Sequence, residues 1–212
     1  MHVIFGITDL AQKLYYLLNQ QGIDVDLFTL DRAWMNQREL YDKPVVAYED
    51  LMPIANEVDL YLAIGYRNMN CIREMVYHRA KADGFRIASF VHFSAIVETE
   101  NLGEGNLILE QVVVGPYSKL GNCNICYPKV LIAHHTVVEN YNFFAISSSV
   151  AGNVRIGNRC FLGNNCCTKD GIILADETLI GAGAYIDRDT EVGACYAPAR
   201  SVRLQKKSSE FY

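Results

Sequence analysis

Residues 130–165 read VLIAHHTVVENYNFFAISSSVAGNVRIGNRCFLGNN, and every sixth residue from Ile132 to Leu162 is large and apolar. The same spacing extends in both directions without an insertion, and Thr168 is its one polar member. The whole series is Ile96, Leu102, Ile108, Val114, Leu120, Cys126, Ile132, Val138, Phe144, Val150, Ile156, Leu162, Thr168, Leu174, Ile180, Ile186 and Val192. A six-residue period is typical of a parallel β-helix, because neither the helical period of 3.6 nor the strand period of 2 generates it.

The register predicts how each coil is built. Three hexads form one triangular coil, so residues eighteen positions apart lie in neighbouring coils that pair with one another. Besides the apolar residue, a second inward position is expected four residues later, where the side chains are small or β-branched. These are Val112, Ser118, Val130, Thr136, Ser148, Val154, Cys160, Cys166, Thr178 and Ala184. Gly or Ala most often follows the apolar residue, and we expect it to form the tight corner.

Composition limits the kinds of function. The chain has 212 residues, a net charge of −5 and 50% hydrophobic residues, which fits one large domain or two small ones. Its mild acidity argues against a nucleic-acid partner, which normally meets a basic surface. No apolar run has the length of a membrane span, and the N-terminus MHVIFGITD lacks the charged start and cleavage site of a signal peptide. We therefore expect a cytoplasmic protein with no membrane insertion.

The seven cysteines are an odd number, as expected in a reducing compartment. Cys123 and Cys126 form a CxxC pair, but Cys126, Cys160 and Cys166 all fall on inward positions of the repeat. We interpret them as small core residues and expect no metal.

The residues before the repeat alternate between strand and helix patterns. Residues 2–6 read as a buried strand, 10–18 as a helix, 23–27 as a second strand, and 60–64 as another strand followed by a helix near 72–80. This predicts a small, Rossmann-like α/β domain with a mostly parallel sheet over residues 1–90. The β-helix then occupies 91–200, and 201–212 form a polar tail. In such sheets ligands bind at the carboxyl ends of the strands, which points to Gly6–Asp9, Asp31 and Gly65–Asn68.

Several motifs resemble those of the bacterial hexapeptide acyltransferases. They are Val3-Ile4-Phe5-Gly6, Ala63-Ile64-Gly65, His92-Phe93-Ser94-Ala95, Ala151-Gly152 and Ala197-Pro198-Ala199-Arg200. The chain looks like the branch containing the sialic-acid O-acetyltransferases and the N-acetyltransferases of nucleotide-linked 4-amino-sugars. The resemblance implies left-handed coiling and a homotrimer with a cleft between adjacent β-helices. Acetyl-CoA would lie in that cleft as co-substrate, and the sugar would approach from the N-terminal domain.

The resemblance also implies catalytic residues. The family's catalytic histidine occupies the third position of a hexad, which is His134 here, and the same position one coil later is Gly152. In the family the N–H of that glycine faces the thioester carbonyl, while the histidine takes a proton from the attacking group. His135 stands where the family often has an acidic residue that orients the imidazole. Phe143 stands where a second family histidine touches the cofactor.

The remaining site predictions divide between the two substrates. Beside Phe143 and Gly152, the cofactor candidates are Gly163, Asn164 and Ala182, which leave room for a pantetheine arm, and Arg200, which with Arg203, Lys206 and Lys207 would meet the CoA phosphates. The acceptor candidates are Gly6, Thr8, Asp9, Asp31, Gly65 and Arg67. Because the Gly6 turn is poor in glycine and Asp9 repels an anion, we expect Arg67 to provide part of a phosphate contact.

The leading hypothesis is an acetyl-CoA-dependent N-acetyltransferase acting on a nucleotide-linked amino-sugar of bacterial surface glycans. O-acetylation of a sialic-acid-type sugar and a non-catalytic trimeric sugar-binding protein are the alternatives. A zinc carbonic-anhydrase-like β-helix would need three histidines, and the repeats offer only His134 and His135.

Overall fold

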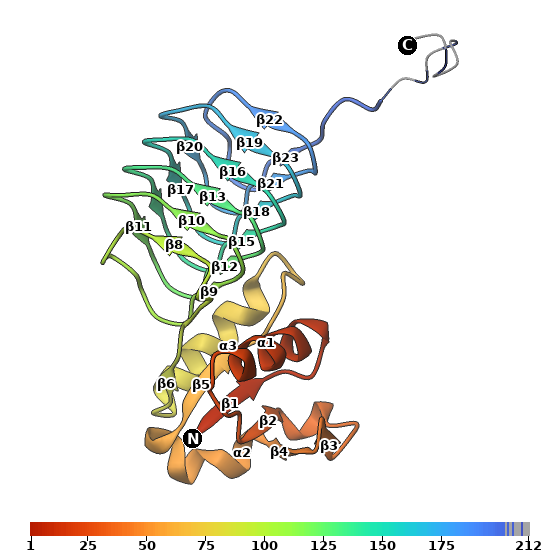
Figure 1. Cartoon of the computed structure of the whole chain (residues 1–212), viewed down its shortest axis with the longest axis vertical. Coiled ribbons are helices and arrows are strands. Elements are labelled where there is room, and N and C mark those ends of the chain that lie inside the picture. Colours follow the sequence, from red (N-terminus) through yellow and green to blue (C-terminus); the bar gives the residue numbers. More distant parts are fainter. Residues whose placement is uncertain (202, 204, 206–208, 210–212) are drawn as a thin grey trace.

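The computed structural model describes residues 1–201, 203, 205 and 209. An α/β part is followed by a β-helix that rises from it, coil upon coil (Figure 1). No helix in the described part of the chain is long and apolar enough to cross a membrane.

The α/β part is built on one sheet with the order β3-β4-β2-β1-β5-β6. Its strands are β1 (His2–Phe5), β2 (Leu27–Leu30), β3 (Glu39–Leu40), β4 (Lys43–Ala47), β5 (Asp59–Leu62) and β6 (Arg86–Ile87). All neighbours are parallel except β3 and β4, so the predicted mostly parallel sheet is observed. The second strand begins at Leu27, later than expected. The helical segments are α1 (Asp9–Gln20), η1 (Arg32–Trp34), α2 (Tyr48–Leu51), η2 (Met52–Glu57) and α3 (Cys71–Ala82).

The β-helix has three faces, which we call A, B and C. Face A consists of β7 (Phe90–Val91), β9 (Leu107–Ile108), β12 (Ile125–Cys126), β15 (Phe143–Phe144), β18 (Phe161–Leu162), β21 (Leu179–Ile180) and β23 (Cys195–Tyr196). Face B consists of β8 (Ile96–Val97), β10 (Val113–Val114), β13 (Leu131–Ile132), β16 (Ser149–Val150), β19 (Cys167–Thr168) and β22 (Tyr185–Ile186). Face C consists of β11 (Lys119–Leu120), β14 (Val137–Val138), β17 (Arg155–Ile156) and β20 (Ile173–Leu174).

The hexad register is confirmed through the body of the β-helix. Cys126 pairs with Phe144 and Ile132 with Val150, each pair eighteen residues apart. Each of these four is the second residue of its two-residue strand, and all four lie in the core. The predicted second inward positions, such as Val154, Cys160 and Cys166, are buried there too. Because each coil is only one strand layer thick, this core exists only where coils stack.

The two ends of the series differ from the prediction. Val97 rather than Ile96 pairs with Val114, and Ile96 is 56% exposed. At the other end Tyr196 pairs with Ile180 after sixteen residues, and Val192 is 72% exposed. A terminal coil has a partner on one side only, so the ladder enforces its register less strictly.

Side chains of the last coil close face C beyond β20. Asp189 Oδ1 accepts a hydrogen bond from the N–H of Ile173 at 2.8 Å, and Thr190 Oγ1 accepts one from the N–H of Ala175 at 2.8 Å. These two oxygens take the place of the backbone carbonyls that a further coil would supply on face C.

The corners lie elsewhere than expected. A left-handed φ recurs at every sixth residue from Gly105 to Gly183, three residues after the inward one, and most of these residues are not glycine. The preference for glycine directly after the inward residue has another reason. A Cβ added at Gly163 would lie 2.6 Å from the backbone nitrogen of Ala182 in the next coil. These positions are small because neighbouring coils approach closely, not because the backbone turns there.

The two parts share a packed junction. Leu107, Ile125 and Phe143 on the outer side of face A pack with Leu10 and Leu14 of α1. Arg73 of α3 is fully buried beside them. Its guanidinium donates to the carbonyls of Ile64, Gly65, Cys123, Tyr141 and Asn142. Burial lowers the pKa of Arg73 to about 10. A cation held mainly by carbonyl oxygens thus links α3 to the coils.

Candidate active site

His134 and His135 lie on the edge between faces B and C, directly after β13 ends at Ile132. Both side chains are exposed, and His135 has a left-handed φ of 58°. Their Nδ1 atoms are 3.1 Å apart, and the ring of Tyr117 lies 4.7 Å from that of His135. A proton on one Nδ1 therefore fixes the tautomer of both rings.

Gly152 lies beside the His134 imidazole, one coil further on. A Cβ at residue 152 would be 2.6 Å from His134 Cε1 and 2.9 Å from Nε2, so only glycine leaves room for the ring in this position. The backbone of Gly152 is buried, although His134 is exposed. The predicted catalytic residues are thus brought together, as their hexad positions indicated.

The N–H of Gly152 donates a hydrogen bond of 2.7 Å to Asp170 Oδ1. Asp170 occupies the same hexad position as His134 and Gly152, two coils after the histidine, and sequence reasoning missed it although this spacing was a usable signal. The neighbouring N–H of Ala151 donates to Thr168 Oγ1 at 3.0 Å, where regular coils use a backbone carbonyl. The one polar residue of the hexad series therefore lies beside the candidate site.

A second feature is a hollow of about 310 Å³ on the edge between faces A and B. It is lined by Tyr66, Tyr127, Phe143, Ala145, Ile146, Phe161, Gly163, Asn164 and Ala182. Four predicted cofactor residues, Phe143, Gly163, Asn164 and Ala182, are among them. Sequence reasoning missed Tyr127 and Phe161, although Phe143 and Phe161 are one coil apart, and it placed Tyr66 only within the acceptor segment Gly65–Asn68.

Aromatic rings form the floor of this A–B hollow. The rings of Phe143 and Phe161 are stacked with centroids 5.4 Å apart, and Tyr66 meets both edge-on at 4.9 Å. Tyr66 comes from the loop after β5, next to the acceptor candidates Gly65 and Arg67. The hollow therefore lies where the α/β part meets the coils.

The A–B hollow and the histidines lie on the two opposite borders of face B. Within one chain the structure does not bring His134 together with Phe143, Asn164 or Ala182. Some outward residues of face B are apolar and exposed, among them Leu131 at 39% and Tyr185 at 60%, whereas Ser149 is polar and half-buried.

The acceptor candidates surround the carboxyl ends of β1, β2 and β5. Gly6 has a φ of 123°, and a Cβ there would lie 2.9 Å from the carbonyl oxygen of Ala63. Thr8 and Asp9 are exposed where α1 begins. The carbonyl of Gly65 accepts a hydrogen bond of 3.0 Å from Arg73, while Arg67 is exposed.

The acceptor candidate Asp31 is paired within the α/β part. It forms an ion pair of 2.6 Å with Arg79, whose guanidinium lies 4.4 Å above the ring of Tyr48. Its carboxylate is thus already engaged by a cation of α3.

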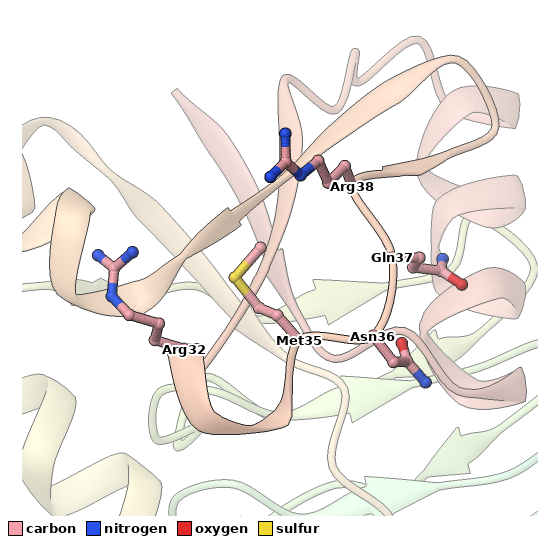
Figure 2. Close-up of a pocket in the computed structure, with 5 residues that line it drawn as sticks. All are labelled: Arg32, Met35, Asn36, Gln37 and Arg38. Atoms are coloured by element: carbon pink, nitrogen blue, oxygen red, sulfur yellow. The ribbon is translucent and has the colours of Figure 1, made fainter.

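A further hollow, of about 420 Å³, follows Asp31 and is lined by Arg32, Met35, Asn36, Gln37 and Arg38. Figure 2 shows the two arginines at either end of this loop with Met35 between them. Arg32 also forms an ion pair with Asp50. Sequence reasoning did not single out this loop, which has no glycine-rich or other phosphate-binding motif.

The predicted phosphate contacts at the C-terminus are described in part. Arg200 and Arg203 are exposed beyond β23, whereas Lys206 and Lys207 lie outside the described residues. Among the residues that are described, no three His, Cys, Asp or Glu side chains gather as a metal site would require.

Comparison with known proteins supports the hexapeptide repeat. The family model "Hexapeptide repeat of succinyl-transferase" matches residues 153–188. Over 103 residues the chain is 31% identical to the acyl-[acyl-carrier-protein]–UDP-N-acetylglucosamine O-acyltransferase of Sinorhizobium fredii (strain NBRC 101917 / NGR234). That match covers 49% of this chain and 34% of the relative, so the chain spans about a third of the length of that curated protein.

Solved structures match nearly the whole chain. One is the GDP-perosamine N-acetyl transferase of Caulobacter crescentus in complex with CoA and GDP-perosamine. It has a TM-score of 0.82 and 26% identity, over 92% of this chain and 91% of that one. The acetyltransferase domain of PglB from Neisseria gonorrhoeae FA1090, in complex with acetyl coenzyme A, has a TM-score of 0.82 and 23% identity over 92% and 94% of the two chains. At that identity it bears on the fold alone. The predicted resemblance to hexapeptide-repeat sugar acyltransferases is confirmed.

Proposed function

We propose that this protein is an acetyl-CoA-dependent N-acetyltransferase that acts on a nucleotide-linked amino-sugar. The observation that carries the proposal is the imidazole of His134 lying against Gly152 on a hexapeptide β-helix. The likeness to a transferase that binds CoA and GDP-perosamine over almost its full length supports the substrate class. By the same resemblance we infer left-handed coiling and a role in the cytoplasmic stage of surface-glycan synthesis.

In the proposed reaction His134 is the general base. Its Nε2 accepts a proton only when the ring carries its own proton on Nδ1, and that N–H then donates to His135 Nδ1. His135 therefore orients the base, in place of the acidic residue that the family often has. The amine attacks the thioester carbonyl, His134 takes the amine proton, and the N–H of Gly152 stabilises the charge that develops on the carbonyl oxygen. The acetyl group ends on the sugar nitrogen, and the proton that His134 took passes to the departing sulfur, so CoA leaves as the thiol.

We infer that each active site is shared between two chains of a homotrimer. The base and the A–B hollow lie on opposite borders of face B, so the B–C edge of one chain must meet the A–B edge of another to place acetyl-CoA beside His134. The exposed apolar residues of face B, including Leu131 and Tyr185, support burial against a second copy.

For the acceptor we infer a Rossmann-like arrangement of the α/β part. The parallel strands run β4-β2-β1-β5-β6, and the chain changes direction across the sheet between β1 and β5, where such folds bind nucleotides. Gly6, Gly65 and Arg67 lie at these strand ends. The A–B hollow, with Tyr66 beside Arg67, then lies near the sugar end of the acceptor.

The experiment is a thiol-release assay with acetyl-CoA and a panel of amino-sugar nucleotides, run beside sialic-acid-type sugars. We expect CoA release only with a nucleotide-linked amino-sugar, and mass spectrometry should find the acetyl group on nitrogen. Release with a sialic-acid-type sugar alone would make the protein an O-acetyltransferase. Binding without release for every acceptor would favour a non-catalytic sugar-binding protein.

A further inference from the structure

The backbone N–H that the proposed reaction needs is already engaged. Gly152 donates it to Asp170 Oδ1 at 2.7 Å, and an N–H makes one strong hydrogen bond at a time. An acyl oxygen can therefore use this donor only after the carboxylate has left. Because Gly152 is buried, its N–H without any acceptor would be costly, so Asp170 satisfies it while no acyl group is bound.

The same contact recurs on the edge between faces C and A, where it is purely part of the coil stack. There Asp176 Oδ1 accepts from the N–H of Asn158 at 2.7 Å, and Asn158 and Asn140 continue the series towards the N-terminus. Asp176 is half-buried and also meets Asn158 Nδ2. Asp170 is exposed, so its side chain is able to rotate into solvent.

The backbone around Gly152 is also less regular than elsewhere. Thr168 Oγ1 replaces a carbonyl as acceptor for Ala151, and the pairing of β16 with β19 joins only Ser149 and Cys167. The N–H of Ala151, next to that of Gly152, is thus held by a side chain where the regular ladder has a carbonyl.

We propose that the acyl oxygen of acetyl-CoA displaces the Asp170 carboxylate from the N–H of Gly152, so that Asp170 sets the preference of the site between acetyl-CoA and free CoA. The proposal rests on the acyl-CoA function proposed above. Free CoA has no acyl oxygen and leaves the Gly152–Asp170 bond intact. Acetyl-CoA must break that bond, and the free energy of breaking it reduces the apparent affinity for acetyl-CoA. Asp170 is a positioning residue in this scheme and takes no proton.

The test is calorimetric titration of acetyl-CoA and CoA into wild type, Asp170→Ala and Asp170→Asn, with Asp176→Asn as the matched control. Since a hydrogen bond to a charged group is worth more than a neutral one, Asp170→Ala should bind acetyl-CoA about tenfold more tightly and CoA unchanged. Asp170→Asn keeps a neutral acceptor like those of Asn140 and Asn158, so its affinity for acetyl-CoA should increase less than that of Asp170→Ala. Asp176→Asn should alter neither affinity.

An unchanged acetyl-CoA affinity in Asp170→Ala, or an equal change for both ligands, would overturn the displacement while leaving the acyltransferase proposal intact. Failure of wild type to bind either ligand would contradict the acyltransferase proposal itself. Because binding is measured without an acceptor, the result does not depend on knowing the sugar.

Discussion

The proposed base, His134, has another titratable ring, that of His135, as its neighbour rather than a carboxylate. A carboxylate would favour the charged imidazolium. The Nδ1 of a neutral imidazole brings no charge, and it either donates or accepts one hydrogen bond. The 3.1 Å contact between the Nδ1 atoms therefore positions His134 without adding a compensating charge.

Replacing His134 with alanine tests the role of base. We expect His134→Ala to reduce turnover by about 10²–10⁴-fold, as loss of an acid–base residue usually does, while acetyl-CoA still binds. His135→Ala should be milder, because it removes the orienting partner only. Steady-state kinetics and calorimetry check this, and the reverse ranking of the two variants would move the base to His135.

Arg67 tests the nucleotide-linked acceptor. If Arg67 contacts a diphosphate, Arg67→Ala should raise the acceptor KM about tenfold or more, since a charged hydrogen bond contributes about 1.5–3 kcal/mol. The KM for acetyl-CoA should not change. A wild-type protein that binds no nucleoside diphosphate at millimolar concentration would count against this class of acceptor.

The residues that could be located from the sequence were those fixed by the six-residue repeat. Counting in sixes placed His134 and Gly152 together because the coil spacing is fixed by backbone pairing. The same count places Asp170 one coil beyond Gly152, but whether its carboxylate accepts the Gly152 N–H depends on a side-chain rotamer. The count did not reveal that Arg79 engages Asp31, since the two residues are far apart in sequence and meet only in the packed domain.

Among the elements, α3 has a role that no sequence pattern indicated. It carries Arg73 into the junction, where the guanidinium bonds to carbonyls of two coils and of the loop after β5. An arginine in a helical pattern is ordinarily interpreted as exposed, and only the fold shows that this one is buried. The helix therefore fixes the loop after β5 to the β-helix.

Removing that cation should be costly. We expect Arg73→Met to lower the free energy of unfolding by about 3–5 kcal/mol, because several buried carbonyls lose their donor. The control is Arg86→Met, which removes an ion pair with Asp59 in which the arginine side chain is 58% exposed, and should lower the free energy of unfolding far less. Denaturant unfolding compares them, and equal losses would argue against the linking role.

The burial of cysteines in the coils predicts how they react with a thiol reagent. Burial raises the pKa of the Cys126 thiol to about 12, and the thiolate is the reactive form. In the native protein at pH 8 Cys126 should therefore resist an aromatic disulfide reagent, while exposed Cys195 reacts promptly. Mass spectrometry of the labelled protein identifies the sites, and early labelling of Cys126 would mean that the coils open.

For the whole molecule, the proposed sharing of each active site between two chains would make assembly a condition of activity. We expect a trimer by light scattering, and we expect its dissociated chains to be inactive because His134 alone faces water.

Mixing two defective variants tests this most directly. His134→Ala removes the base, and Ala182→Trp should fill the A–B hollow, so each is expected to be inactive alone. Unfolding and reassembling them together should restore part of the activity, because some interfaces then join an intact base to an intact hollow. Recovery is measured against each variant reassembled alone, and no recovery would mean that each chain holds a complete site.

Closure of face C by Asp189 and Thr190 has a consequence for the solution behaviour of the protein. A stack of parallel strands that ends in bare N–H groups is a template on which further chains can grow, as in fibrils. Here the donors of Ile173 and Ala175 are occupied by short polar side chains that offer no strand to extend. The same periodicity that allows the coils to stack within one molecule is thus prevented on face C from continuing into the next, which favours a discrete particle over a filament.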